Sequence, residues 1–148
     1  MRVKFKRYHK DAKIPTKAYK GDFCYDCYAV TEEQIAPNVW KYDLGFGLQI
    51  VRDSNIDDDS LLSIDIRPRS SVWKTGMILS NCEGTIDEGY LNTISAVFYH
   101  VMPNMPRYKV GDRICQMKIG ATLPIEFVEV DELNDTERGM KGYGSSGL

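Results

Sequence analysis

Leu62-Ser63-Ile64-Asp65-Ile66-Arg67 is the stretch of this sequence that most clearly sets the fold class. Its aliphatic side chains alternate with polar ones, which is the period of a β-strand with one buried face. Pro68-Arg69-Ser70-Ser71 follows directly and interrupts the alternation. A serine at this point can cap the free N–H groups of a short helix, so the sequence predicts a strand followed by a helical turn.

Other segments also have the sequence pattern of β-strands. Apolar residues alternate with small or aromatic ones over 94–99, which favours a strand covered on both sides. Residues 115–119 alternate between apolar and polar side chains, and the run 125–130 predicts one more strand. No window predicts a long amphipathic helix, and no βαβ rhythm or internal repeat occurs. We therefore expect an all-β domain, a jelly roll, sandwich or barrel, with at most one short helix.

Composition narrows the class of protein. The chain has 148 residues, 43% of them hydrophobic and 27% charged, which fits one globular domain. Nineteen basic residues against 21 acidic ones give a net charge of −2, so we expect no nucleic-acid partner. No apolar run reaches the roughly 18–20 residues of a membrane helix, so we also expect no membrane association. The basic start is not followed by the apolar stretch of a signal peptide, and we expect a cytoplasmic protein with reduced cysteines.

Two motifs that suggest metals are incomplete. Cys24-Tyr25-Asp26-Cys27 is a C-x-x-C, but a structural zinc site needs a second ligand pair, which the sequence does not offer at suitable spacing. We therefore expect Cys24 and Cys27 to be semi-buried strand residues. Residues 53–59 begin like a calcium loop, yet Asp58 stands where glycine is required and Ile64 where a glutamate should close the loop. This segment is predicted to be a solvated acidic loop.

Four further segments could carry chemistry. The hydroxyls and guanidiniums of 67–71 can bind a phosphate beside a helix start, although a plain capping turn with surface arginines is the better explanation of this segment taken alone. Residues 84–90 hold two adjacent carboxylates and an aromatic ring between glycines, as a hairpin tip also would. Residues 111–116 read as a turn entering a strand, and the glycine-rich 139–148 as a mobile tail. Their order along the chain is more informative than any one of them.

Taken in order, these segments resemble the five motifs of the trimeric dUTP pyrophosphatases (dUTPases), over nearly the whole chain. Residues 21–29 are similar to A-G-[YF]-D-L-Y-A, with Cys24 and Cys27 in place of the usual Gly and Leu. The other four are Pro68-Arg69-Ser70-Ser71, residues 81–90 (N-x-x-G-x-I-D-x-x-Y), residues 111–116 (G-D-R-[IL]-A-Q) and residues 138–147 (R-G-x-x-G-F-G-S-[ST]-G).

The resemblance implies a distorted jelly-roll, β-sandwich-like catalytic domain over 1–137 and a C-terminal tail, 138–148, that closes the active site of another subunit. It implies a homotrimer with three active sites at subunit boundaries. The implied reaction is dUTP + H₂O → dUMP + pyrophosphate, by attack of water on the α-phosphorus, with Mg²⁺ bound through the triphosphate.

The resemblance also implies roles for individual residues. Asp87 would hold and deprotonate the attacking water, and Asp26 would be structural or would reach the metal through water, with no protein side chain binding the metal directly. The implied substrate contacts are Asn81, Gly84, Thr85 and Ile86 on the uracil, Tyr90 beneath the deoxyribose, Arg69, Ser70, Ser71 and Gln116 on the phosphates, Arg138, Gly144, Ser145 and Ser146 closing over them, and Tyr143 stacked on the base.

Two alternatives remain at this point. A dCTP deaminase shares the fold, but deamination requires a glutamate beside the pyrimidine ring. A catalytically silent dUTPase-like protein would bind or regulate without turnover, although Asp87, Gln116, Arg138 and the tail argue against lost activity. A structural β protein would leave the tail chemistry unexplained.

Overall fold

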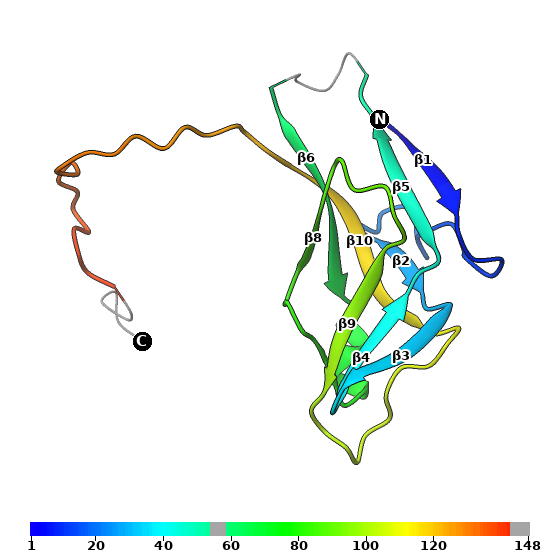
Figure 1. Cartoon of the computed structure of the whole chain (residues 1–148). Helices are drawn as coiled ribbons and strands as arrows, with labels where there is room; N and C mark the ends of the chain where they lie inside the picture. The colour runs from blue at the N-terminus through cyan, green and yellow to red at the C-terminus, as the bar shows by residue number, and fades with distance from the viewer. Residues whose placement is uncertain (54–58, 143–148) are drawn as a thin grey trace.

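The computed structural model describes residues 1–53 and 59–142, and within them the regular secondary structure consists of antiparallel strands and one short 3₁₀ helix (Figure 1). The elements are β1 (Arg2–Arg7), β2 (Tyr25–Tyr28), β3 (Thr31–Ala36), β4 (Val39–Asp43), β5 (Phe46–Val51), β6 (Leu61–Pro68), the 3₁₀ helix η1 (Ser70–Lys74), β7 (Met77–Leu79), β8 (Gly84–Asp87), β9 (Ser95–His100) and β10 (Arg113–Thr122).

The strands form two four-stranded sheets and a two-stranded ribbon. One sheet has the order β2-β10-β6-β8, the other β3-β4-β9-β7, and β1 pairs with β5. The predicted all-β, sandwich-like class with one short helix is confirmed. Within the described part of the chain, no helix is long and apolar enough to cross a membrane.

The core lies between the two sheets. On β6, Leu62, Ile64 and Ile66 are buried as the alternation predicts, and Ile66 faces Met117 of β10 across the ladder. From the other sheet, Tyr42 and Phe98 are fully buried and meet edge to face with ring centroids 5.9 Å apart. The inward-facing apolar positions of both sheets therefore make one continuous core.

Two local predictions need correction. Strand β9 is buried on one face only, because β9 lies in an outer layer of the sandwich and Tyr99 points outward with 46% of its surface exposed. The helical turn starts at Ser70, with Arg69 as its N-cap, and no side chain caps it. The hydroxyl of Ser71 instead accepts a hydrogen bond from Arg69 Nη1 at 3.1 Å.

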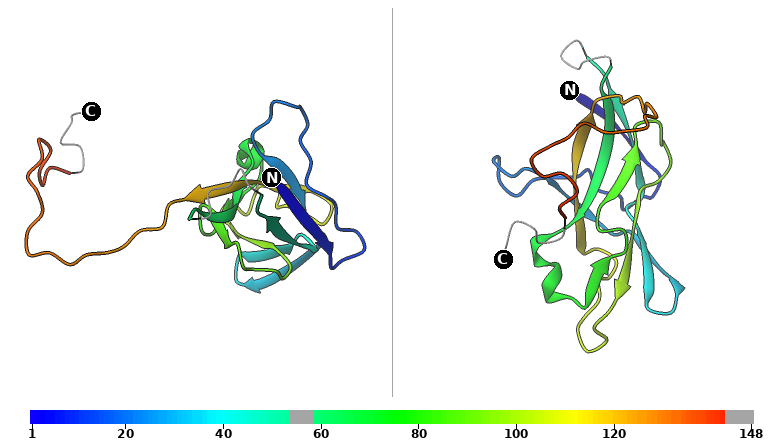
Figure 2. Two further views of the ribbon diagram at one scale, coloured as in Figure 1. Left: turned by 90° about the horizontal axis from the view of Figure 1, so that it is seen from above. Right: turned by 90° about the vertical axis from the view of Figure 1, so that its left-hand side faces the viewer.

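The strand predicted over 125–130 does not form. The chain is extended there, but it leaves the body of the sandwich after β10 and has no neighbouring strand of its own chain to pair with (Figures 1 and 2). Its apolar side chains are exposed, Ile125 by 74% and Phe127 by 90%. The run of strand-forming residues predicted an extended chain, but a strand also needs a backbone partner.

Tyr42 provides a test of the core. Its buried hydroxyl donates to the carbonyl of Tyr108 at 2.8 Å. Tyr42→Phe removes this hydrogen bond while the carbonyl keeps a second donor, Arg107 Nη1 at 3.1 Å, and we expect it to lower the free energy of unfolding by about 0.5–1.5 kcal/mol. Urea unfolding measures the change. Tyr99→Phe, on the outward face of β9, is the matched control, and an equal loss in both variants would contradict the interpretation.

The contact of Asp65 with Lys118 predicts that part of the stability of the fold is lost in acid. Burial raises the pKa of Asp65, but hydrogen bonds from Lys118 and Ser63 outweigh burial and hold that pKa below its usual value. The stabilisation is therefore complete above about pH 4 and is lost as the pH falls through the lowered pKa. Urea unfolding at a series of pH values should show this loss in the wild type and in the exposed control Asp135→Asn. Asp65→Asn should lack it, and identical profiles for all three would refute the assignment.

Candidate functional site

A pocket of about 430 Å³ lies beside the edge strand β2, where the end of β6 and the start of β10 meet. Four residues singled out from the sequence line it: Asp26, Arg69, Ser70 and Gln116. The remaining lining residues are Ala18, Tyr19, Asp22, Phe23, Cys24 and Arg113. Three segments that are far apart in the sequence thus contribute to one polar hollow.

Asp26 lies between two arginines in this pocket. Arg69 donates through Nε to one carboxylate oxygen at 2.8 Å, and Arg113 donates through Nη1 to the other at 3.0 Å. Asp26 and Arg69 are largely covered, with 16% and 23% of their side chains exposed, so solvent screens this pair less than a surface pair. The carboxylate of Asp26 fixes where the two guanidiniums stand, and guanidiniums held in this way are suited to bind an anion. Asp22 also lines the pocket, so its two arginines and two aspartates balance in formal charge.

Arg113 reaches Asp26 because of a β-bulge. The register of β10 against β2 shifts between Arg113 and Cys115, so Ile114 is an extra residue. Ile114 and Cys115 are both fully buried, which turns Arg113 to the outward face that carries Asp26. Without the extra residue, strict alternation would place Arg113 on the core face with Cys115.

Two further polar side chains are held by hydrogen bonds. Gln116 donates through Nε2 to the carbonyl of Pro68 at 2.9 Å, which ties β10 to the end of β6. Ser71, also predicted from the sequence, holds Arg69 from the other side. Arg113 was not among the predicted site residues, although its place in Gly111-Asp112-Arg113 beside Gln116 could have suggested it.

A second group of predicted residues gathers on β8 and the turn after it. Thr85, Ile86, Asp87 and Tyr90 line a shallow pocket of about 220 Å³. The hydroxyl of Tyr90 donates to the carbonyl of Thr93 at 3.0 Å, which fixes the ring at the pocket. The other lining residues are Thr93, Ile94 and Ser95.

Asn81 and Gly84 adjoin this second group. A Cβ on Gly84 would come within 3.3 Å of Asn81 Nδ2 and 3.5 Å of the Ile66 Cβ, so the backbone passes close beneath the Asn81 amide. The structure therefore brings together all of the residues predicted to contact a base and a sugar, apart from those of the tail.

The two adjacent carboxylates of this turn have different environments. Glu88 forms two hydrogen bonds with Arg52, at 2.9 Å from Nε and 2.7 Å from Nη2, and this contact lowers the pKa of Glu88. Among the described residues, no side chain pairs with the exposed carboxylate of Asp87. Glu88 thus has a structural partner, and Asp87 is available to a ligand or a water molecule.

The arginine pocket and the pocket beside Asp87 are lined by different residues. They share no lining residue in the described part of the structure. Arg138 lies in the segment that leaves the sandwich, and its Nε donates only locally, to the carbonyl of Lys141 at 3.0 Å. Tyr143, Gly144, Ser145 and Ser146 lie outside the described residues.

The acidic side chains do not form a metal centre by themselves. Within residues 1–53 and 59–142, no group of three or more histidine, cysteine or acidic side chains is arranged to hold a metal ion. Cys27 lies in β2, as the sequence predicted, but it is fully rather than partly buried. Cys24 is half-buried, as predicted, but it precedes the strand. The acidic loop prediction falls mostly on residues 54–58, outside the described residues.

The chain is similar along its whole length to curated bacterial proteins. The deoxyuridine 5′-triphosphate nucleotidohydrolase of Clostridium novyi (strain NT) is 33% identical over 150 residues, covering 100% of both chains. The protein of the same name from Clostridium kluyveri is 35% identical over 148 residues and covers 99% of each chain.

Solved structures share the fold. A mutant dUTPase of Staphylococcus bacteriophage 80alpha, solved with dUpNHpp, superimposes with a TM-score of 0.79 at 21% identity and covers 99% of both chains. A mutant dUTPase from phage phi11 of S. aureus, described with a structural Mg(II) ion, gives a TM-score of 0.69 at 16% identity, covering 91% of this chain and 100% of its own. The dUTPase family model matches residues 10–147, and the chain therefore belongs to the dUTPase family.

Proposed function

We propose that this protein is a dUTP diphosphatase that converts dUTP and water to dUMP and pyrophosphate by attack of water on the α-phosphorus. The observation that carries the proposal is the contrast between Asp87 and Glu88. Of these two neighbouring carboxylates, Glu88 is occupied by Arg52, and Asp87 stands free beside Thr85 and Tyr90. A free carboxylate can orient a water molecule and accept its proton, a contribution typically of about 10²–10⁴-fold in rate.

The arginine pocket is suited to the phosphates. Arg69 and Arg113 supply donors whose positions Asp26 fixes before a ligand arrives, and Ser70 and Gln116 add polar groups on the same wall. Preorganised donors stabilise the charge that develops on the phosphates without further reorganisation. Ser71 acts through Arg69, whose guanidinium it contacts.

We propose that Mg²⁺ arrives bound to the triphosphate. Both oxygens of Asp26 already accept hydrogen bonds from arginines, so this carboxylate suits a contact through water better than direct ligation. A bound Mg²⁺ would neutralise phosphate charge and orient the leaving pyrophosphate.

Base recognition would use the backbone of β8. This strand is at the edge of its sheet and pairs only with β6, so its outer N–H and C=O groups are open to a ligand. The edge of uracil can pair with such groups around Gly84, Thr85 and Ile86, with the Asn81 amide beside them. The ring of Tyr90 would then lie beneath the deoxyribose.

The geometry favours hydrolysis over the alternatives. No glutamate is among the described residues that line the Tyr90 pocket, and Glu88 nearby is bound to Arg52, so the base of a deaminase is not supplied there. A silent binding protein would not need the free Asp87 carboxylate. Pyrophosphate release measured against ammonia release separates the three functions.

We propose that the working site is completed in a homotrimer. Within one chain the arginine pocket and the Asp87 pocket share no described lining residue, which supports a site that is completed where two copies meet. The C-terminal residues Arg138, Tyr143, Gly144, Ser145 and Ser146 would close this composite site from another subunit. Glycines there let the backbone approach phosphates closely.

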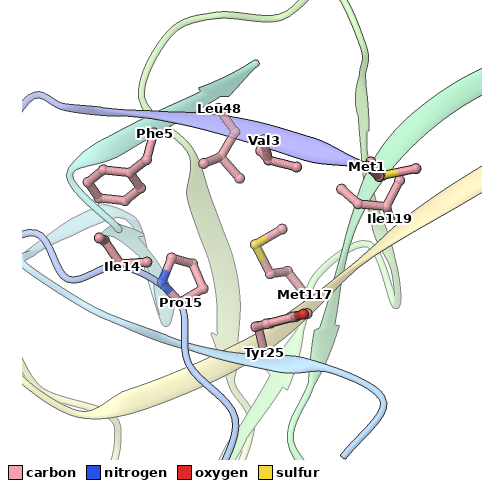
Figure 3. A pocket seen from close by; sticks show the side chains of 9 residues that line it. All are labelled: Met1, Val3, Phe5, Ile14, Pro15, Tyr25, Leu48, Met117 and Ile119. Carbon is pink, nitrogen blue, oxygen red and sulfur yellow. The ribbon is translucent and has the colours of Figure 1, made fainter. Parts of the chain in front are cut away.

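An apolar groove supports the association of copies. Met1, Val3 and Phe5 of the N-terminal strand face Tyr25, Met117 and Ile119 across a hollow of about 380 Å³ (Figure 3). Ile14, Pro15 and Leu48 complete its lining. Strand β1 pairs only with β5, so its other edge is free for one more strand.

The occupant that we propose for this groove is segment 123–130 of a second copy. That segment is extended, is rich in apolar residues, and exposes Ile125 and Phe127. Ile125 and Phe127 are two residues apart, so in an extended chain they lie on one face. That apolar face matches the apolar lining of the groove.

Asp87→Asn tests the assignment of the base. We expect pyrophosphate release from dUTP to fall by about 10²–10⁴-fold, because the amide cannot accept the proton of the water. Binding of a non-hydrolysable dUTP analogue, measured by calorimetry, should be nearly unchanged. The assay is run across the deoxynucleoside triphosphates with and without Mg²⁺. Glu33→Gln, exposed on β3, is the control, and full activity of Asp87→Asn would overturn the role.

Phe127→Glu tests the assembly. A charge in place of this ring should weaken the binding of the segment in the apolar groove. We therefore expect the mass from light scattering to fall from three subunits toward one, with a parallel loss of dUTP hydrolysis. Asn134→Glu adds the same charge four residues beyond this segment without removing an apolar side chain and should leave the mass unchanged. An intact trimer in Phe127→Glu would contradict the proposed contact.

A further inference from the structure

Two buried cysteines face each other beneath the arginine pocket. Cys27 of β2 and Cys115 of β10 are direct partners in the antiparallel register. Both are free thiols, 1% and 0% exposed, and both lie on the core face of the sheet. Directly facing residues of antiparallel strands have Cα atoms about 4.5–5.5 Å apart. That spacing is inside the range of about 4.4–6.8 Å that a disulfide requires.

The position of the pair in the sheet connects it to the pocket. The next rung of the same ladder joins Asp26 to Gln116, and these two side chains point to the opposite face, where they line the pocket. Any restraint on the Cys27–Cys115 rung therefore acts on the backbone that carries Asp26 and Gln116. Neither cysteine contacts the pocket itself among its described lining residues.

We propose that Cys27 and Cys115 form a reversible disulfide that fastens β2 to β10. The oxidant is a low-molecular-weight disulfide such as glutathione disulfide. One cysteine thiolate attacks it to give a mixed disulfide and one released thiol. The second cysteine then attacks the mixed disulfide, the Cys27–Cys115 bond forms, and a second small thiol leaves. Two protein thiols are oxidised, and one small disulfide is reduced to two thiols.

The structure also accounts for slow reaction in the folded state. The pKa of Cys27 is well above its ordinary value because Cys115 hydrogen-bonds to its thiol and because the thiol is buried, so little nucleophilic thiolate is present. Strand β2 has only four residues and lies at the edge of its sheet, so local opening of β2 is the step that exposes the pair. The disulfide would then oppose further opening.

The test uses the full chain with Cys24→Ser and Cys82→Ser, which leaves only the facing pair. After incubation with glutathione disulfide, thiols titrated in denaturant should fall from two to none. The intact mass should show the loss of two hydrogens and no attached glutathione. The urea midpoint should rise on oxidation and return on reduction. Adding Cys115→Ala is the control, which should remove both the hydrogen loss and the shift of the midpoint.

Two results would overturn the proposal. One is the recovery of two titratable thiols, or of two glutathione adducts, after the protein has been incubated with the oxidant at a urea concentration near its unfolding midpoint. The other is a different linkage in the wild-type protein, such as Cys24–Cys27, found by peptide mapping after free thiols are alkylated. These measurements do not use turnover, so their failure is distinguishable from failure of the proposed dUTP hydrolysis.

Discussion

The register of β10 between β2 and β6 is the constraint on which the rest of this structure depends. It places Met117 against Ile66 in the core and puts Gln116 on the outward face, opposite Asp26 on one side and Arg67 on the other. A slip of one residue would bury Gln116 and expose Cys115 and Met117. The apolar face therefore fixes the register, and the register in turn assembles the arginine pocket from segments that are far apart in the sequence.

The bulge at Ile114 shows how one irregularity serves the site. A regular strand does not turn two consecutive side chains toward the same core. The bulge lets Ile114 and Cys115 both lie in the core, and it turns Arg113 outward. Asp26 then holds two guanidiniums that would otherwise repel each other. An acidic residue in a pocket for phosphates is thus consistent with anion binding, because it orders the cations that do the binding.

Two pockets and one apolar segment lack a partner within the described part of a single chain. Among the described residues, the arginine pocket and the Tyr90 pocket have no lining residue in common, and cations line only the first of these two. The segment after β10 exposes apolar side chains beyond any described strand of its own chain. Each of these features is costly or without use in an isolated subunit. Association of copies would resolve all of them together, which is why assembly and catalysis are linked in the proposed function.

Much of this protein was readable from its sequence. The alternation of 62–67 and of 115–119 predicted strands that form, because the period of side-chain burial is a local property. The ordered motifs indicated several of the residues that line both pockets, although not Arg113. A run of strand-forming residues cannot show whether a strand has a partner, so 125–130 was predicted as a strand and yet forms none in this structure. Which of Asp87 and Glu88 is free, how Arg113 turns toward Asp26, and that Cys27 faces Cys115 were decided only by the tertiary structure, because each depends on a residue brought from another part of the chain.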